Sequence, residues 1–155
     1  MTHARQQIRE AAATVLKASP STWGSVFETR IPSSRAVLPY LMIFSDGEAE
    51  NQESVNLPGV YLRDLNLVVA GRLRLPGNSD TETVEDRMDA LAAEVETKLT
   101  FAALLAALPQ LKRLRLTNTE QVVVIDEQDS PQYAEVTLSF VAQYATAEGL
   151  PETLI

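Results

Sequence analysis

Residues 60–75, VYLRDLNLVVAGRLRL, form a long strand-like stretch that sets the predicted fold class of this 155-residue chain. Residues of one parity carry the apolar side chains that could cover a core: Leu65, Leu67, Val69, Leu73 and Leu75. An average strand has about 5–6 residues, so a strand of this length outruns the core of a small domain. We predict that part of it projects as a ribbon, or that a β-bulge bends it at Gly71.

One helix is predicted before this long strand in the sequence and another after it. Residues 3–18 place apolar side chains at helical spacing, and the residues around Pro20 end the segment because a proline disfavours the α conformation of the residue before it. Residues 79–108 carry a second apolar stripe at steps of three and four, with a break near Thr100. Ser79 and Glu82 form a capping-box pattern, so the sequence predicts that this helix starts at Ser79.

Four further segments have strand character: residues 23–30, 38–44, 111–125 and 134–144. The last of them alternates cleanly between apolar and polar side chains, as a half-buried antiparallel strand does, whereas residues 111–125 fit either a strand pair or one long bent strand. The order is then α-β-β-β-α-β-β. This order predicts an α+β fold with a single domain over residues 1–155, in which two principal helices pack on one face of a mainly antiparallel sheet.

Three segments are expected to lie outside this framework. Residues 45–59 contain four acidic side chains and no basic one, and we expect a solvated, mobile acidic loop there; a cation site at residues 46–50 is the alternative. Residues 126–131 have the composition of a turn, and a cation site is the alternative there as well. The C-terminal tail, residues 145–155, is expected to be loose.

Composition excludes several classes of function. The chain has 13 Lys and Arg against 21 Asp and Glu, no cysteine and a single histidine, His3. Disulfide scaffolds, zinc fingers and thiol catalysis need cysteine, and the acidic balance argues against binding nucleic acid through released counterions. The N-terminal residues lack the apolar region of a signal peptide, and no apolar run approaches the ~18 residues of a membrane span. We expect no enzyme activity and no catalytic, cofactor-binding or metal-ligating residue.

Basic side chains stand at predicted strand positions. Arg72 and Arg74 share one face by the two-residue period of a strand, as do Arg113 and Arg115. They form either an electropositive stripe that meets an acidic neighbour or the solvent face of a sheet whose charges oppose aggregation. Charge is also segregated along the chain, since residues 1–40 carry five basic and two acidic groups. Opposite patches of this kind allow head-to-tail association, which closes into a ring when the rotation fits.

The candidate interaction residues follow from this charge pattern. They are the basic side chains near predicted strands and the acidic side chains of residues 45–59: Arg30, Arg35, Asp46, Glu48, Glu50, Glu53, Arg72, Arg74, Arg113 and Arg115.

The order of several segments carries a resemblance to a known family. They are the aromatic strand VFETR (26–30), the proline-led apolar strand LPYLMIF (38–44), the acidic loop after it, the turn LPGNSD (75–80) before an acidic helix, and the final strand AEVTLSFVAQY (134–144). Over most of the chain this order resembles the tail terminator proteins of long-tailed bacteriophages, the group that includes the minor tail protein U of phage lambda. Two features depart from the family pattern: the basic stretch KRLR (112–115) and the residues after Tyr144.

The resemblance implies a structural role in the virion. Such proteins form a ring, in this family a hexamer, on the head-proximal end of the tail tube; they end tube polymerisation and provide the surface that joins the head. The implied partners are further copies of the chain, the tail tube protein and the head–tail connector proteins, and the protein would be made in the host cytoplasm. Two alternatives remain open: another head–tail connector or tube-related subunit, and a small α+β enzyme or ligand-binding domain.

Overall fold

The computed structural model of the chain describes residues 2–18, 21–33, 35–51, 58–77, 79–125, 128 and 131–155. Its elements are, in chain order, α1 (Ala4–Lys17), β1 (Ser25–Phe27), β2 (Tyr40–Glu50), β3 (Val60–Leu73), α2 (Val84–Lys98), α3 (Phe101–Ala107), β4 (Arg113–Ile125), β5 (Pro131–Ala147) and β6 (Leu150–Leu154).

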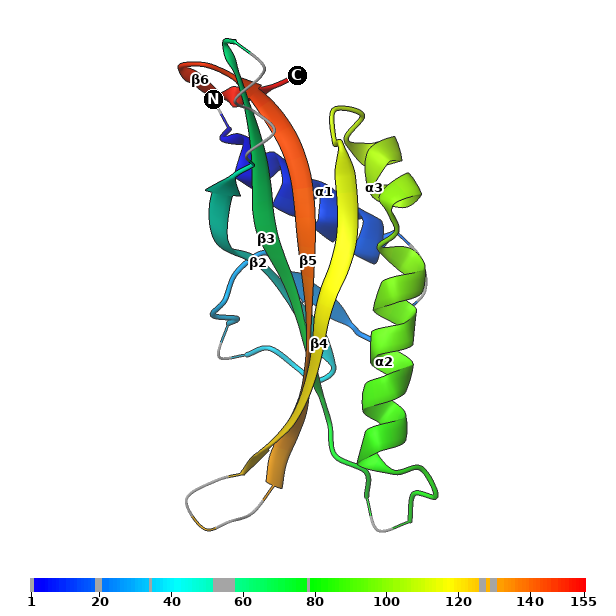
Figure 1. The fold of residues 1–155 in the computed structure, drawn as a ribbon. Helices are drawn as coiled ribbons and strands as arrows, with labels where there is room; N and C mark the ends of the chain where they lie inside the picture. Colours follow the sequence, from blue (N-terminus) through cyan, green and yellow to red (C-terminus); the bar gives the residue numbers. More distant parts are fainter. Residues whose placement is uncertain are drawn as a thin grey trace.

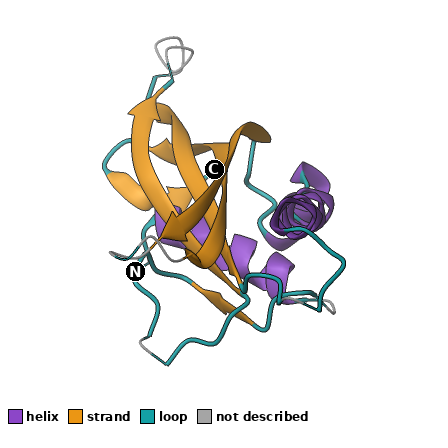
Figure 2. Ribbon diagram, turned by 90° about the horizontal axis from the view of Figure 1, so that it is seen from below, coloured by secondary structure: helices purple, strands orange, loops and turns teal. Residues whose placement is uncertain are grey.

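The six strands form one mixed, mostly antiparallel sheet. Its order is β1-β2-β3-β5-β4, with β6 paired to β5, and the short β1 runs parallel to β2. The helix α2 runs along the strands, whereas α1 crosses them, and both termini lie at the same end of the molecule (Figure 1). Seen along the strands, α2 appears end-on beside the curved sheet (Figure 2). The predicted α+β class is therefore confirmed.

The pairing of β3 with β5 is continuous. Its register runs from Val60 opposite Ala147 to Leu73 opposite Ala134 without a shift, so the bulge predicted at Gly71 is wrong. Gly71 is instead required by packing, because a Cβ atom added there would lie 2.7 and 2.9 Å from the two methyl carbons of Leu91 on α2. The register shift next to β3 lies in β2, between Ser45 and Glu48.

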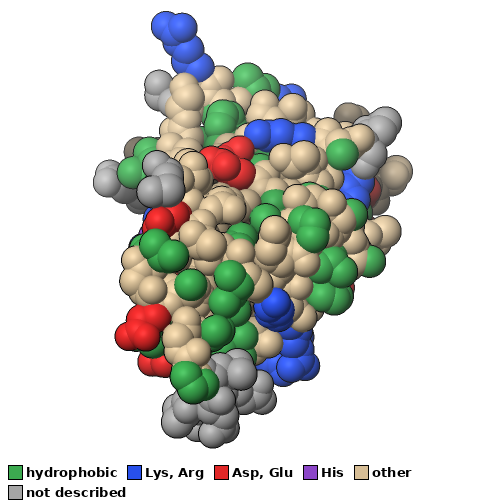
Figure 3. Space-filling model, turned by 90° about the horizontal axis from the view of Figure 1, so that it is seen from above, with side chains coloured by type: hydrophobic (Ala, Val, Ile, Leu, Met, Phe, Trp, Pro, Cys, Tyr) green, Lys and Arg blue, Asp and Glu red, His purple; other side chains and the backbone are tan. Residues whose placement is uncertain are grey.

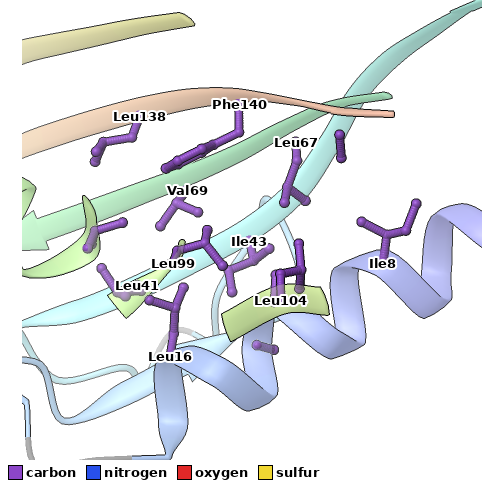
Figure 4. Packing of buried hydrophobic residues seen from close by; sticks show 14 of the residues in the cluster. Ile8, Leu16, Leu41, Ile43, Leu67, Val69, Leu99, Leu104, Leu138 and Phe140 are labelled. Atoms are coloured by element: carbon purple, nitrogen blue, oxygen red, sulfur yellow. The ribbon is translucent and has the colours of Figure 1, made fainter. Parts of the chain in front are cut away.

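One hydrophobic core joins the three helices to one side of the sheet, which we call the helix side. Side chains of α1 and α3 meet alternate residues of β2, β3 and β5, and Figure 4 shows Ile8 and Leu16 pointing toward the strands with Leu104 between them. The apolar parity of β3 predicted from the sequence supplies Leu65, Leu67 and Val69 to this core, all three fully buried. Burial of this kind stabilises the fold by about 25 cal/mol for each Å² of apolar surface removed from water.

The second predicted helix is split and begins later than expected. The break predicted near Thr100 is present, because α2 ends at Lys98 and Thr100 caps α3 by accepting a 3.1 Å hydrogen bond from the Ala103 N–H. The start predicted at Ser79 is wrong: the capping box consists of Thr83 and Asp86, and helix α2 begins at Val84. Hydrogen bonds from the backbone N–H and the side chain of Thr83 lower the pKa of Asp86, which favours the charged form of this cap.

Gly77 and residues 79–82 lie outside the helix, and other contacts hold Gly77, Asp80 and Glu82. Asp80 accepts a 2.7 Å hydrogen bond from the Gly77 N–H, and Arg87 reaches back to both Asp80 and Glu82. The acidic side chains that the sequence places in the first helical turn at positions 80 and 82 therefore form ion pairs in front of the helix.

The acidic loop expected over residues 45–59 is in part a strand. Residues 45–50 continue β2 and pair with β3, with Glu48 opposite Leu65 and Glu50 opposite Arg63. Because β3 is long, it can pair with this extension of β2. Arg63 of β3 contributes a positive charge next to the acidic side chains of the extension. Residues 52–57, including Glu53, lie outside the described residues.

The C-terminal tail expected to be loose also forms strands. β5 continues to Ala147, the chain reverses through Gly149 with φ +76°, and β6 pairs antiparallel with β5. The Gln7 side chain amide donates a 2.8 Å hydrogen bond to the Glu152 carbonyl, which ties β6 to α1. Of the predicted turn at 126–131, residues 126, 127, 129 and 130 lie outside the described part of the chain.

We expect the substitution Gly71→Ala to lower the free energy of unfolding by about 1–3 kcal/mol, because the new methyl group overlaps the buried Leu91. Urea denaturation measures this change. Gly77→Ala is the matched control, since the nearest atom to a Cβ at Gly77 is 3.7 Å away. The cost of Gly71→Ala should shrink in a Leu91→Ala background; an equal cost in both backgrounds would show that the two residues are not coupled.

Candidate functional site

The side of the sheet opposite the helices is covered over only part of its width. A second, smaller hydrophobic cluster lies there over β2 and β3: Tyr40, Met42 and Ala70 are packed by Phe27, Ala36, Leu38 and Phe44. Farther across, over β5 and β4, the same side carries mostly polar and charged side chains. We call this part the open face; it is formed by alternate residues of β4 and β5, among them Arg113, Arg115, Val122, Ser139, Val141 and Gln143.

Arg113 and Arg115 lie together on the open face, as the two-residue period predicts. Arg113 is opposite Gln143 and Arg115 is opposite Val141 in the β4–β5 register. Both side chains are exposed, and they line a hollow of about 220 Å³ together with Asn51, Asp64, Val141 and Gln143. Within the described residues neither guanidinium group takes part in an ion pair within 4.0 Å, so both are available to an acidic group from outside the chain.

Asp64 is the acidic side chain in this hollow, and two side-chain amides donate hydrogen bonds to its carboxylate. Its two carboxylate oxygens accept hydrogen bonds from Asn51 Nδ2 at 2.9 Å and from Gln143 Nε2 at 3.1 Å. The contacts keep Asp64 in place without using the two arginines. The hollow therefore keeps a net positive charge of one unit from these three ionised groups.

Arg72 and Arg74 do not form an electropositive stripe, which was one of the two alternatives for them. Arg72 is half-buried and binds Glu135 at 2.7 Å and the Tyr40 hydroxyl at 3.2 Å, with its guanidinium 4.7 Å from the centre of the Tyr133 ring. Burial opposes its charge, but the hydrogen bonds to Glu135 and Tyr40 outweigh burial and raise the pKa of Arg72. Arg74 lies beyond the end of β3 at Leu73, where it is exposed and lines a different hollow beside α2.

Glu48, predicted as a surface interaction residue, lies between α1 and the sheet. Its side chain is 11% exposed, accepts hydrogen bonds from Arg63 and the Tyr144 hydroxyl, and lies 3.6 Å from Arg5 Nε. Burial alone would raise the pKa of Glu48, but these hydrogen bonds and the two positive charges lower it. Burial and the adjacent carboxylate raise the pKa of Tyr144, so the hydroxyl keeps its proton and acts as a donor. The four side chains form a structural cluster that joins α1, β2, β3 and β5.

The remaining candidates are dispersed. Arg30 binds Asp46 at 2.9 Å and the Ser45 carbonyl at 2.7 Å, so these two predicted residues pair with each other. Arg35 is exposed in the segment between β1 and β2, and Glu50 is exposed at the end of β2. The alternative of a cation site at residues 46–50 loses its ligands, because arginine side chains already bind Asp46 and Glu48. Among the described residues no group of three or more histidine, aspartate or glutamate side chains could hold a metal ion.

Sequence reasoning missed an acidic stripe along one exposed side of α2, next to β4. Glu85, Asp89 and Glu96 are exposed, and their spacing of four and seven residues places them on one side of the helix. Asp89 accepts a 2.6 Å hydrogen bond from Gln121 Nε2, whereas no described residue forms an ion pair with Glu85 or Glu96. The helical spacing is the available signal, but the helix dipole also explains acidic residues such as Glu85 and Asp89 near the start of a helix. Figure 3, which looks along the strands from the end where the termini lie, shows small groups of acidic and basic side chains on the surface, some of them next to each other.

Comparison with known proteins does not assign the chain to a family: no protein-family model matches it, and no curated protein sequence matches it. No helix among the described residues is long and apolar enough to cross a membrane.

We expect Glu48→Gln to lower the free energy of unfolding by about 1–3 kcal/mol near neutral pH, since it removes a charge that the buried Tyr144 and the half-buried Arg63 bind. The folded-state pKa of Glu48 is lowered, so its contribution is full above the unfolded value of about 4.5 and is lost as pH falls through the folded value. The difference in stability between wild type and Glu48→Gln should therefore shrink as the pH drops below about 4.5. Urea denaturation at several pH values tests this, with Glu85→Gln at an exposed carboxylate as control. A difference independent of pH would contradict the role of the Glu48 charge.

We expect Arg72→Glu to destabilise the fold by about 1–3 kcal/mol, because it places a second carboxylate beside Glu135 in a half-buried site. Arg74→Glu reverses the same charge at an exposed position and should change stability by no more than about 0.5 kcal/mol. Thermal and urea unfolding of the two variants provide the comparison. Equal effects would mean that the contacts of Arg72 with Glu135 and Tyr40 contribute nothing specific.

Proposed function

We propose that the chain is the subunit of a phage tail terminator. In this role several copies, by resemblance six, form a ring on the head-proximal end of the tail tube. The ring ends tube polymerisation and provides the surface that joins the head, so the partners are other copies of the chain, the tail tube protein and the head–tail connector proteins.

The observation that carries this proposal is the open face around Arg113 and Arg115. It presents two cations without an ionic partner on a rigid part of the sheet, and among the described residues no helix or loop of the chain lies over it. Charges placed on strands of the scaffold are held in position and suit a specific contact with another protein. The order of the sequence segments resembles that of tail terminators, and this resemblance indicates that such a contact would serve a ring on the tail tube.

A ring also needs two different contact surfaces on each subunit, because a head-to-tail interface joins one patch to another. The helix layer and the open face lie on opposite sides of the sheet and differ in chemistry, since one exposes acidic side chains and the other exposes arginines. The same two surfaces would also suit a head–tail connector or a tube-related subunit. The position of the protein in the particle separates these roles.

We expect phage particles assembled without this protein to carry overlong tails or tails without heads, because nothing would end tube growth or provide the joining surface. Electron microscopy of the particles measures tail length and head attachment. Supplying the intact chain should restore tails of normal length joined to heads. Normal tails joined to heads in its absence would overturn the proposal, and tails of normal length that lack heads would favour the connector role.

A further inference from the structure

Some charged side chains of this chain form ion pairs within the molecule, and others form none. Seven acidic side chains form an ion pair within the described part of the chain: Glu28 with Lys17, Asp46 with Arg30, Glu48 with Arg63, Asp80 and Glu82 with Arg87, Glu94 with Lys98, and Glu135 with Arg72. The acidic stripe on α2, formed by Glu85, Asp89 and Glu96, is among the acidic groups that form none. Its three carboxylates face solvent, and no described cation lies within ion-pair distance of them.

The open face shows the opposite charge in a similar arrangement. Arg113 and Arg115 are exposed and without an ion pair among the described residues, and they are separated by two strand residues, about 7 Å. Glu85 and Asp89 are separated by four helical residues, about 6 Å along the axis. Two guanidinium groups on a strand can therefore meet two carboxylates on a helix at nearly equal spacing.

The two patches cannot meet within one molecule. Arg113 and Arg115 point to the side of β4 opposite the helices, while Gln121, on the helix side of the same strand, binds Asp89 of α2. Because they lie on opposite sides of the sheet, a contact between them must join two copies of the chain. Such a contact is heterologous, so each copy keeps one free patch of each kind for the next neighbour.

The shapes of the two patches also agree with a close contact. The open face is a sheet surface whose hollow is lined by the half-buried Val141 beside the arginines, and α2 presents the small side chain of Ala93 between Asp89 and Glu96. A helix laid on a sheet face is one of the stable layer arrangements in proteins.

We propose that α2 of one copy docks on the open face of the next copy, with Arg113 and Arg115 binding the acidic stripe Glu85, Asp89 and Glu96. This inference rests on the proposed self-assembly and names the two surfaces that form the contact between neighbours. The contact depends on charge, so added salt weakens it.

Charge reversal and exchange test the proposal on the full chain. The variant Arg113→Glu/Arg115→Glu makes the open face acidic, and Glu85→Lys/Glu96→Lys makes the α2 stripe basic while Asp89 keeps its bond to Gln121. We expect each variant alone to raise the concentration needed for self-association by about tenfold or more, because like charges then face each other. The equimolar mixture of the two variants should associate again, since each open face then finds a neighbour with opposite charge. A single chain carrying all four substitutions should associate in the same way.

Sedimentation velocity over a range of protein and salt concentrations measures association. The control Glu10→Lys reverses an exposed charge on another surface and should behave as wild type. Thermal unfolding checks that each variant is folded. If the reversals disturb folding, the milder Arg113→Gln/Arg115→Gln should still weaken association.

The outcomes distinguish failure of the proposed ring from failure of the proposed contact between α2 and the open face. A wild-type chain that never self-associates, alone or on tail tubes, overturns the ring and this contact together. A wild-type assembly that Arg113→Glu/Arg115→Glu leaves unchanged overturns this contact and leaves the ring standing. Loss of association that neither the mixture nor the four-fold variant restores rules out α2 as the occupant and directs attention to an acidic segment of another protein.

Discussion

The antiparallel pairing of β3 with β5 is the interaction on which the other parts of this structure depend. All 14 residues of β3 pair in one register with β5, and this fixes which side chains face the helices and which face away. Because the side-chain period of a strand is two, a slip of one residue would move Leu65, Leu67 and Val69 out of the core and expose them. The close approach of α2 at Gly71 depends on the same register, since Leu91 occupies the space that a larger residue would need.

Charged side chains divide into those that hold the sheet together and those that remain available. Glu48 and Arg72 are both half-buried or more, and each joins strands through contacts within the chain. Removing one member of such a pair leaves the other buried without compensation, which costs more than the pair contributes. Arg113, Arg115, Glu85 and Glu96 form no ion pair within the described residues, and exposed charges of this kind contribute little to folding. In the proposed assembly these charges select and orient the neighbouring copy.

The periodic parts of the sequence predicted the fold well, and the polar parts predicted it poorly. The apolar parity of β3 and the stripe of α2 were sufficient for the α+β class, because burial dominates the choice of element. The acidic composition of Ser45–Glu50 predicts a loop, but Arg63 and Tyr144, from other parts of the chain, stabilise a strand there. Ser79 and Thr83 offer the same capping chemistry, so the sequence does not fix the start of α2; in the structure Arg87 binds Asp80 in front of the helix. The pairing of Arg72 with Glu135, 63 residues apart, follows from strand order, which the local sequence does not contain.

The central claim is that assembly covers the open face of the sheet, and cysteine labelling measures this directly because the chain has no cysteine of its own. Val141→Cys places a single thiol beside Arg113 and Arg115, and Thr14→Cys places one on the exposed outer side of α1 as a reference. We expect the rate of maleimide labelling at position 141 to fall strongly when the chain assembles, while the rate at position 14 stays the same. Equal labelling rates at position 141 in the free and assembled protein would contradict it.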